Sequence, residues 1–372
     1  MQMRIRTAAG LAALAALAAA AAPSAASAGP QPTALFTQTN AASGNHVLVF
    51  STGPRGLRRV ASVATGGLGT GAGLGSQGSV SFNPGRTRLY VVNAGSGSLS
   101  VLGVDGAHAW RERVVGSGGA DPISVTAGRR WVYVLNAGGT PGVTGFRATP
   151  GGLARIPGGS RALTAADLTP EQVSLSPSGR TLVVTNKDSS TIDTFAVHAD
   201  GSLGPAHSQA SNGAASYGFA FTPNGRLIVS DAGQAPTSAA TSYRIDRHGV
   251  LHTVSGPLQT NQLAACWVAV APNGRYAYVA DAHSGTVSGL AVARNGAISL
   301  LDPSGITASG GAGSTTLDEA VSPGSRMFSV LVLNTKPGVN AILSFRIAAD
   351  GSLHRMSRTP ALPTGTSGLA IG

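Results

Sequence analysis

The chain has 372 residues, of which 52 are glycine and only 11% are charged. This composition suits a sheet protein with many tight turns and excludes a protein built of long helices. The formal net charge is +11, but the cations are scattered, with no run longer than Arg58-Arg59 or Arg129-Arg130. A nucleic-acid binder would show a basic stripe with interleaved aromatic residues, so no nucleic-acid partner is expected.

Residues 1–28 have the pattern of a secretory signal peptide. Arg4 and Arg6 precede a short Ala/Leu stretch, and a small-residue cleavage site ends at Ala28. The apolar stretch is too short to span about 30 Å of hydrocarbon comfortably, which argues against a membrane anchor. The sequence therefore predicts a secreted protein, extracellular or associated with the cell wall, without membrane insertion. Its mature chain, residues 29–372, is expected to form a single domain.

One motif recurs along the mature chain. An apolar, β-branched strand ends on Asn or Asp, and a few small polar residues follow it. The clear copies are LYVVN, VYVLN, LVVTN and AYVAD, and weaker copies occur near both ends and in the middle. The strand-end residues are Asn40, Asn93, Asn136, Asn186, Asp231, Asp281 and Asn334, at spacings of 43 to 53 residues. A period of this length indicates one supersecondary unit per repeat.

Each repeat has the same internal order. A short apolar strand and a tight turn such as SPSGR, at Ser176, come before the motif. A third strand, a hairpin such as ADGSL at Ala199, and a short fourth strand follow it. Four antiparallel strands repeated seven times predict an all-β, seven-bladed β-propeller. The first repeat lacks its inner strand, and the C-terminal GTSGLAIG supplies one, so the last strand is predicted to close the first blade.

A glycine-rich stretch, GGLGTGAGLG from Gly66, lies before the second repeat's inner strand. A phosphate-binding loop would lie between a strand and a helix, which this stretch does not. We interpret it as a flexible loop between blades.

The LYVVN, VYVLN and AYVAD motifs, with SPSGR-type turns and DGSL hairpins, resemble the lactonase family of seven-bladed propellers. That family includes the bacterial 6-phosphogluconolactonases and the fungal carboxymuconate cyclases, and it is similar to the YVTN repeats of surface-layer proteins. The resemblance covers nearly the whole mature chain. It implies a site at the channel mouth that hydrolyses a lactone or, as a lactonising cycloisomerase, forms one.

Lactone chemistry needs a water-activating base and a positive group for the developing oxyanion. Glu171 is the candidate base because it directly precedes an inner strand. Lys187, directly after Asn186 in the same repeat, is the candidate cation. His283, two residues after Asp281, is a second candidate base.

Other polar residues are expected to line the channel mouth. They are Gln77, Asn93, Asp121, Asn136, Asn186, Asp281 and Asn334. A structural role also explains the strand-end members, since Asn or Asp there can bond its own downstream backbone. Only Asp231 and Asp281 among the seven strand-end residues are carboxylates, fewer than calcium usually uses, so neither a metal nor a cofactor is expected.

Two functions remain open at this point. One is an exported lactonase acting on a small lactone or carbohydrate. The other is a non-catalytic propeller that binds a cell-wall glycan, a polymer or a protein. A closed ring has no sheet edge that requires a partner, so a monomer is expected.

Overall fold

The computed structural model describes residues 33–372, apart from 54–55, 164–168, 235–237 and 335–339. The predicted signal peptide therefore lies outside the described residues. Within the described part of the chain, no helix is long and apolar enough to cross a membrane.

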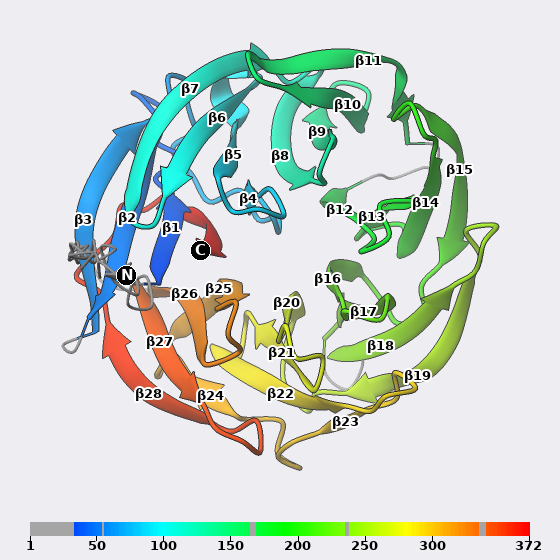
Figure 1. Cartoon of the computed structure of the whole chain (residues 1–372). Coiled ribbons are helices and arrows are strands. Elements are labelled where there is room, and N and C mark those ends of the chain that lie inside the picture. Colours follow the sequence, from blue (N-terminus) through cyan, green and yellow to red (C-terminus); the bar gives the residue numbers. More distant parts are fainter. Residues whose placement is uncertain (1–32, 54–55, 164–168, 235–237, 335–339) are drawn as a thin grey trace, which may run out of the picture. The chain divides into compact units, whose positions relative to one another are not determined.

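Seven sheets are arranged around a central axis, as Figure 1 shows. We number them as blades 1 to 7 and give the strands of each from the axis outward. Blade 1 consists of β29 (Ser367–Ile371), β1 (Ala34–Gln38), β2 (His46–Gly53) and β3 (Gly56–Ala64). Blade 2 consists of β4 (Val80–Phe82), β5 (Arg88–Asn93), β6 (Ser98–Asp105) and β7 (His108–Gly116). Blade 3 consists of β8 (Ala120–Ala127), β9 (Trp131–Gly138), β10 (Gly142–Thr149) and β11 (Gly152–Ala162). Blade 4 is β12 (Pro170–Leu175), β13 (Thr181–Asn186), β14 (Thr191–Val197) and β15 (Leu203–Ala210), and blade 5 is β16 (Ser216–Phe221), β17 (Arg226–Ala232), β18 (Ser238–Ile245) and β19 (Leu251–Gln259). Blade 6 consists of β20 (Ala265–Val270), β21 (Tyr276–Asp281), β22 (Thr286–Val292) and β23 (Ile298–Leu300). A short fifth strand, β24 (Ala308–Ser309), also pairs with β22. Blade 7 consists of β25 (Ser314–Val321), β26 (Met327–Asn334), β27 (Ala341–Ile347) and β28 (Leu353–Arg358).

The predicted closure of the ring is confirmed. β29 pairs antiparallel with β1, with Leu35 opposite Ile371 and Phe36 opposite Ala370. The backbones of Ala34 and Gly372 exchange hydrogen bonds of 3.1 and 2.9 Å. The last strand is therefore the innermost strand of the first blade (Figure 1).

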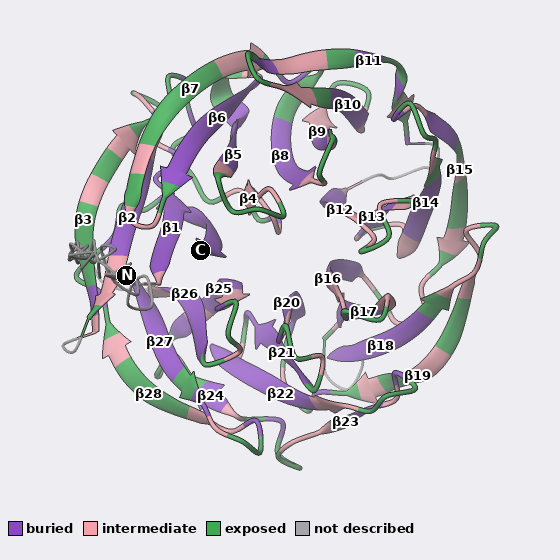
Figure 2. Cartoon of the chain, in the orientation of Figure 1, coloured by how far each residue is buried: buried purple, intermediate pink, exposed green. Residues whose placement is uncertain are grey.

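Stacking of neighbouring blades forms the core. The second strands are rich in β-branched residues and bury nearly every residue, whereas most residues of the outer strands are exposed or half-buried, as Figure 2 shows. Tyr90 and Val92 of blade 2, for example, belong to the same buried cluster as Val132 and Val134 of blade 3. Each sheet is apolar on both faces, so a blade is stable only between two others.

Candidate active site at the inner ends of the blades

A β-bulge near the start of an inner strand is common to several blades. The antiparallel register shifts between Pro122 and Ser124, Pro170 and Gln172, Ser216 and Phe219, Ala265 and Trp267, and Thr316 and Glu319. A bulge leaves one residue unpaired and turns its side chain away from the regular alternation. Ile123, Glu171, Tyr217, Cys266 and Asp318 occupy these irregular positions, and their placement on the innermost strands brings them near the channel.

The structure brings Glu171 and Lys187 together. Lys187 Nζ lies 3.3 Å from Glu171 Oε1. Glu171 begins the inner strand β12, and Lys187 follows the end of β13, which pairs with β12. The Glu171 side chain is 6% exposed and that of Lys187 is 35% exposed, so only the ammonium group has ready access to solvent.

The environment of Glu171 places its proton equilibrium near neutrality. Burial raises the pKa of the Glu171 carboxyl to about 7, and the charge of Lys187 partly opposes this shift. Water solvates a carboxylate better than the protein interior does, so burial stabilises the neutral acid relative to the anion. A carboxyl with this pKa exchanges protons readily at neutral pH.

Aromatic side chains of two further blades complete the surroundings of this pair. Lys187 Nζ lies 6.0 Å from the centre of the Tyr217 ring. Tyr217 packs edge-on against Trp267, with ring centres 5.1 Å apart. The sequence placed Tyr217 at the start of an inner strand, but the blade repeat alone gave no sign that it would face Lys187.

The glycine-rich segment connects blade 1 to blade 2, as predicted, and its last residues are anchored in the channel. The Tyr217 hydroxyl donates to the Gly75 carbonyl, and Trp267 Nε1 donates to the Ser76 carbonyl at 3.1 Å. The Ser76 hydroxyl donates to the Ile123 carbonyl of blade 3 at 2.8 Å. Two glycines here pack closely against the ends of second strands: a Cβ at Gly67 would lie 2.4 Å from the Asn93 side chain, and one at Gly69 would lie 2.1 Å from the Asn40 carbonyl carbon. At these positions only glycine fits, whereas a Cβ at Gly73 would meet nothing within 4 Å.

Gln77 ends this segment and spans the channel. Its side-chain amide donates to the Val268 carbonyl at 2.7 Å and accepts from the Val268 N–H at 3.0 Å. Gln172 pairs in the same way with the backbone of Phe219. The Gln77 N–H also donates to the Glu171 carbonyl at 3.1 Å. Gln77 therefore lies in the channel, where it satisfies backbone groups on the free edge of an inner strand.

The strand-end residues are parts of the blade interior. Asn93, Asn136, Asn186 and Asp281 are at most 2% exposed. Asn93 Nδ2 donates to the hydroxyls of Ser98 and Ser100, and Asn186 Nδ2 donates to Asp193. Their side chains thus bond to side chains of the third strand rather than to the downstream backbone, and they do not face an open mouth.

The remaining predicted residues lie apart from the Glu171–Lys187 pair. Asp121 is exposed near the start of β8 and His283 is exposed in the turn after β21, and no contact among the described residues joins either to Glu171. The side chain of Asn334 lies outside the described residues, although its backbone ends β26 opposite Ser314. The described residues also contain no cluster of three His, Cys, Asp or Glu side chains that could hold a metal.

Two buried acids of blade 7 were not predicted as site residues. Asp318 and Glu319 are 4% and 6% exposed, and burial raises the pKa of both, that of Asp318 to about 7. Asp318 accepts a hydrogen bond of 2.9 Å from the Gly368 N–H of the closing strand. Their position before an inner strand was the available sequence signal, and it indicated a channel location without indicating a role.

Asp281 makes stability depend on pH. Burial raises the pKa of its carboxyl to about 8, although hydrogen bonds from Ser288 and two threonines oppose the shift. The folded protein therefore retains a proton that the unfolded chain releases near the ordinary value of 3.8, so stability falls as pH rises from about 4 to about 8.

Replacing this carboxyl by an amide should remove that loss. Blades 2, 3 and 4 already have Asn at the equivalent position. Asp281→Asn should come closest to the wild type in thermal unfolding at pH 4 and exceed it at pH 8.5, by on the order of a few kcal/mol. Asp302→Asn, a change at an exposed carboxyl, is the control and should have no such effect. An equal difference between Asp281→Asn and wild type at both pH values would contradict the prediction.

No family model matches the chain, and no curated protein sequence matches it significantly. Solved structures do match its fold. A protein from Bacteroides fragilis designated a candidate 6-phosphogluconolactonase has a TM-score of 0.68 at 14% identity, covering 93% of this chain and 99% of its own. The periplasmic gluconolactonase of Pseudomonas aeruginosa has a TM-score of 0.67 at 17% identity, covering 91% and 98%. A Lactobacillus plantarum protein has a TM-score of 0.71 at 16% identity, covering 92% and 100%. The chain is thus a seven-bladed β-propeller with the same fold as these three structures.

Proposed function

We propose that this protein hydrolyses a lactone at the end of the channel where Glu171 and Lys187 meet. One observation supports the proposal above others: a buried carboxyl with a pKa near 7 lies 3.3 Å from a partly exposed ammonium group. A base works best when its pKa is near the working pH. Burial also brings the pKa values of Asp281 and Asp318 near neutrality, but of these three acids only Glu171 has an ion pair among the described residues.

The two groups supply what ester hydrolysis requires. The Glu171 carboxylate removes a proton from a water molecule as its oxygen bonds to the lactone carbonyl carbon. The Lys187 ammonium stabilises the negative charge on the carbonyl oxygen. When the tetrahedral intermediate collapses, the bond to the ring oxygen breaks, and Glu171 returns its proton to that oxygen. The product is a hydroxy acid, and Glu171 is again ionised.

Access to the pair is from the side of Lys187, whose side chain is 35% exposed, against 6% for Glu171. Five hollows in the described part of the chain are lined by other residues, and none of these five includes Glu171 or Lys187. The anchored segment that ends in Gln77 lies beside the pair, since Gln77 bonds the Glu171 backbone. A sugar-sized lactone approaching over Lys187 suits this arrangement, and the expected export favours a lactone found outside the cytoplasm.

Acid release from a panel of sugar γ- and δ-lactones, followed in a pH-stat, tests the proposal. The wild-type chain from residue 29 should accelerate the opening of at least one lactone, and Glu171→Gln should abolish the acceleration. Asp200→Asn changes an exposed carboxyl on an outer hairpin of the same blade and should act as wild type. A wild type without effect on every lactone, or a fully active Glu171→Gln that melts normally, would overturn the proposal.

A further inference from the structure

Arginine recurs at the turn between the first and second strands of blades 2 to 7. The turn carries Arg86, Arg129 with Arg130, Arg180, Arg275 and Arg326, and in blade 5 Arg226 directly follows it as the first residue of β17. None of these six turns contains Asp or Glu. Because the blades repeat one strand order around one axis, equivalent turns come to the same end of the channel. The scattered cations of the sequence are thus gathered in the fold.

This end is opposite to the candidate active site. In blade 4, Glu171 lies at the beginning of β12, and the turn that leads to Arg180 follows Leu175 at its other end. An inner strand of this length separates the two ends by roughly 15 Å. The arginines therefore belong to a separate surface, which we call the turn face.

Connected hollows run along the turn face. The largest, of about 830 Å³, is lined by Arg129, Arg130 and Trp131 and reaches the Ser176–Ser178 turn of blade 4. A second, of about 260 Å³, shares that turn and extends to Pro223 and Asn224 of blade 5. A third, of about 580 Å³, shares Pro223 and Asn224 and reaches Arg275 and Arg294 of blade 6. The three form an arc across five blades, from Pro84 of blade 2 to Arg275 of blade 6, and no acidic residue lines any of them. A further hollow of about 540 Å³ adjoins the arc at Ser178, and there Arg180 and Arg247 are accompanied by one carboxylate, Asp246.

The arginines that border this arc are available for a ligand. Arg129, Arg130, Arg275 and Arg294 are exposed, and none has an ion pair among the described residues.

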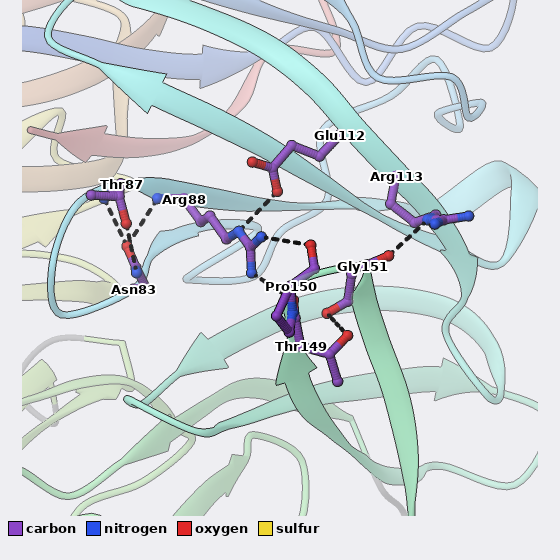
Figure 3. A network of polar contacts seen from close by, with 9 residues as sticks. Asn83, Thr87, Arg88, Glu112, Arg113, Thr149, Pro150 and Gly151 are labelled. Atoms are coloured by element: carbon purple, nitrogen blue, oxygen red, sulfur yellow. Dashed lines mark hydrogen bonds and ion pairs between the residues drawn. The ribbon is translucent and has the colours of Figure 1, made fainter.

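Figure 3 shows the contrast at the junction of blades 2 and 3, where Arg88 does pair. Its Nε lies 2.8 Å from Glu112, and its guanidinium donates to the Thr149 carbonyl at 3.0 Å. Arg88 therefore fastens two blades together, whereas the arginines of the arc have no ion pair among the described residues, and Arg275 only lies over the ring of its neighbour Tyr276, 5.3 Å from its centre.

We propose that the turn face binds an extended anionic polysaccharide along this arc. Guanidinium groups pair strongly with carboxylate and phosphate oxygens, and a groove lined by one sign of charge concentrates the opposite charge. Trp131 is half-buried against the core of blades 3 and 4 and also lines the largest hollow, where the exposed part of its ring can pack against the apolar face of a sugar.

Other polyanions fit less well. Single-stranded nucleic acid needs a series of aromatic side chains on which bases stack, and among the residues lining the arc only Trp131 and Phe221 are aromatic. A lipid surface would favour exposed large apolar side chains next to the cations. The exposed ones, among them Trp110 and Met356, are not part of the arc.

Fluorescence anisotropy with a labelled polygalacturonate dodecamer tests the proposal. The chain from residue 29 should bind it, with an affinity that falls as salt rises. The double variant Arg129→Gln/Arg130→Gln should bind at least tenfold more weakly and with a shallower salt dependence. Arg58→Gln/Arg59→Gln makes the same charge change on the outer strand β3, away from the turn face, and should bind as wild type.

The contrary outcomes are distinct. Equal weakening in both double variants would show that only net charge matters and would overturn the proposal, as would a wild type that does not bind. Tighter binding of duplex DNA or anionic vesicles than of the polysaccharide, lost in Arg129→Gln/Arg130→Gln, would also overturn it by assigning the face to another partner. Lactone hydrolysis should remain unchanged in both double variants, so the two proposals fail separately.

Discussion

A chain that ends at Gly365 should fail to form a stable ring. The deletion removes β29, and with it every backbone hydrogen bond on the inner side of β1. It also removes Leu369 and Ile371 from a buried cluster that joins blades 1 and 7. The Arg86 guanidinium of blade 2 loses its bond to the Ile371 carbonyl, and Asp318 of blade 7 loses its bond to the Gly368 N–H.

The free energy of folding that is lost with β29 exceeds what an ordinary domain can lose and still remain folded. Folded domains are stable by only about 5–15 kcal/mol, and two buried aliphatic side chains alone contribute about 4–10 kcal/mol by the cost of their truncation to Ala. We expect the truncated protein to aggregate, or to unfold without a cooperative transition in circular dichroism. A synthetic peptide of residues 366–372 should restore part of the transition by adding the missing strand in trans. A truncated chain that melts cooperatively near the wild-type temperature would contradict this prediction.

A point variant separates closure from general chain length. Ile371→Ala should cost about 2–5 kcal/mol, because its side chain is 4% exposed and packed between two blades. Met356→Ala, at a side chain that is 55% exposed on the outer strand β28, should cost little. Urea unfolding of the two variants measures the difference.

The repeat made the fold predictable from sequence. A strand that ends on Asn93, Asn136, Asn186 or Asp281 at a period near fifty has few architectures available, and the missing first strand indicated the closure by residues 367–371. The pairing of Glu171 with Lys187 followed from the same geometry, since both lie at the ends of adjacent strands.

What the repeat did not predict depends on contacts between blades. The glycine-rich segment is anchored by Tyr217 and Trp267, which lie at least 142 residues away from it, and no local pattern indicates such bonds. The arginines of the turn face show the opposite case. Their signal was present as one Arg per turn at the blade period, but a search for runs of charge does not find it.

The pH dependence of lactone hydrolysis should identify Glu171 as the base. In the wild type, kcat/KM should rise with pH and level off above about 7, where the carboxyl is ionised. Glu171→Gln should remove this rise with pH, which we call the limb, and should lower kcat/KM by roughly 10²–10⁴-fold.

Lys187 should affect both the limb and the plateau. Its positive charge lowers the pKa of Glu171, so Lys187→Met should move the limb to higher pH. The plateau should also fall by roughly 10²-fold, because the oxyanion loses its positive partner. Lys187→Arg retains the charge and should keep the limb close to its wild-type position. If the plateau of kcat/KM falls in Lys187→Met but the limb stays at the same pH, Glu171 is not the group that titrates. If neither the limb nor the plateau changes, the Glu171–Lys187 ion pair only stabilises the bulge at the start of β12.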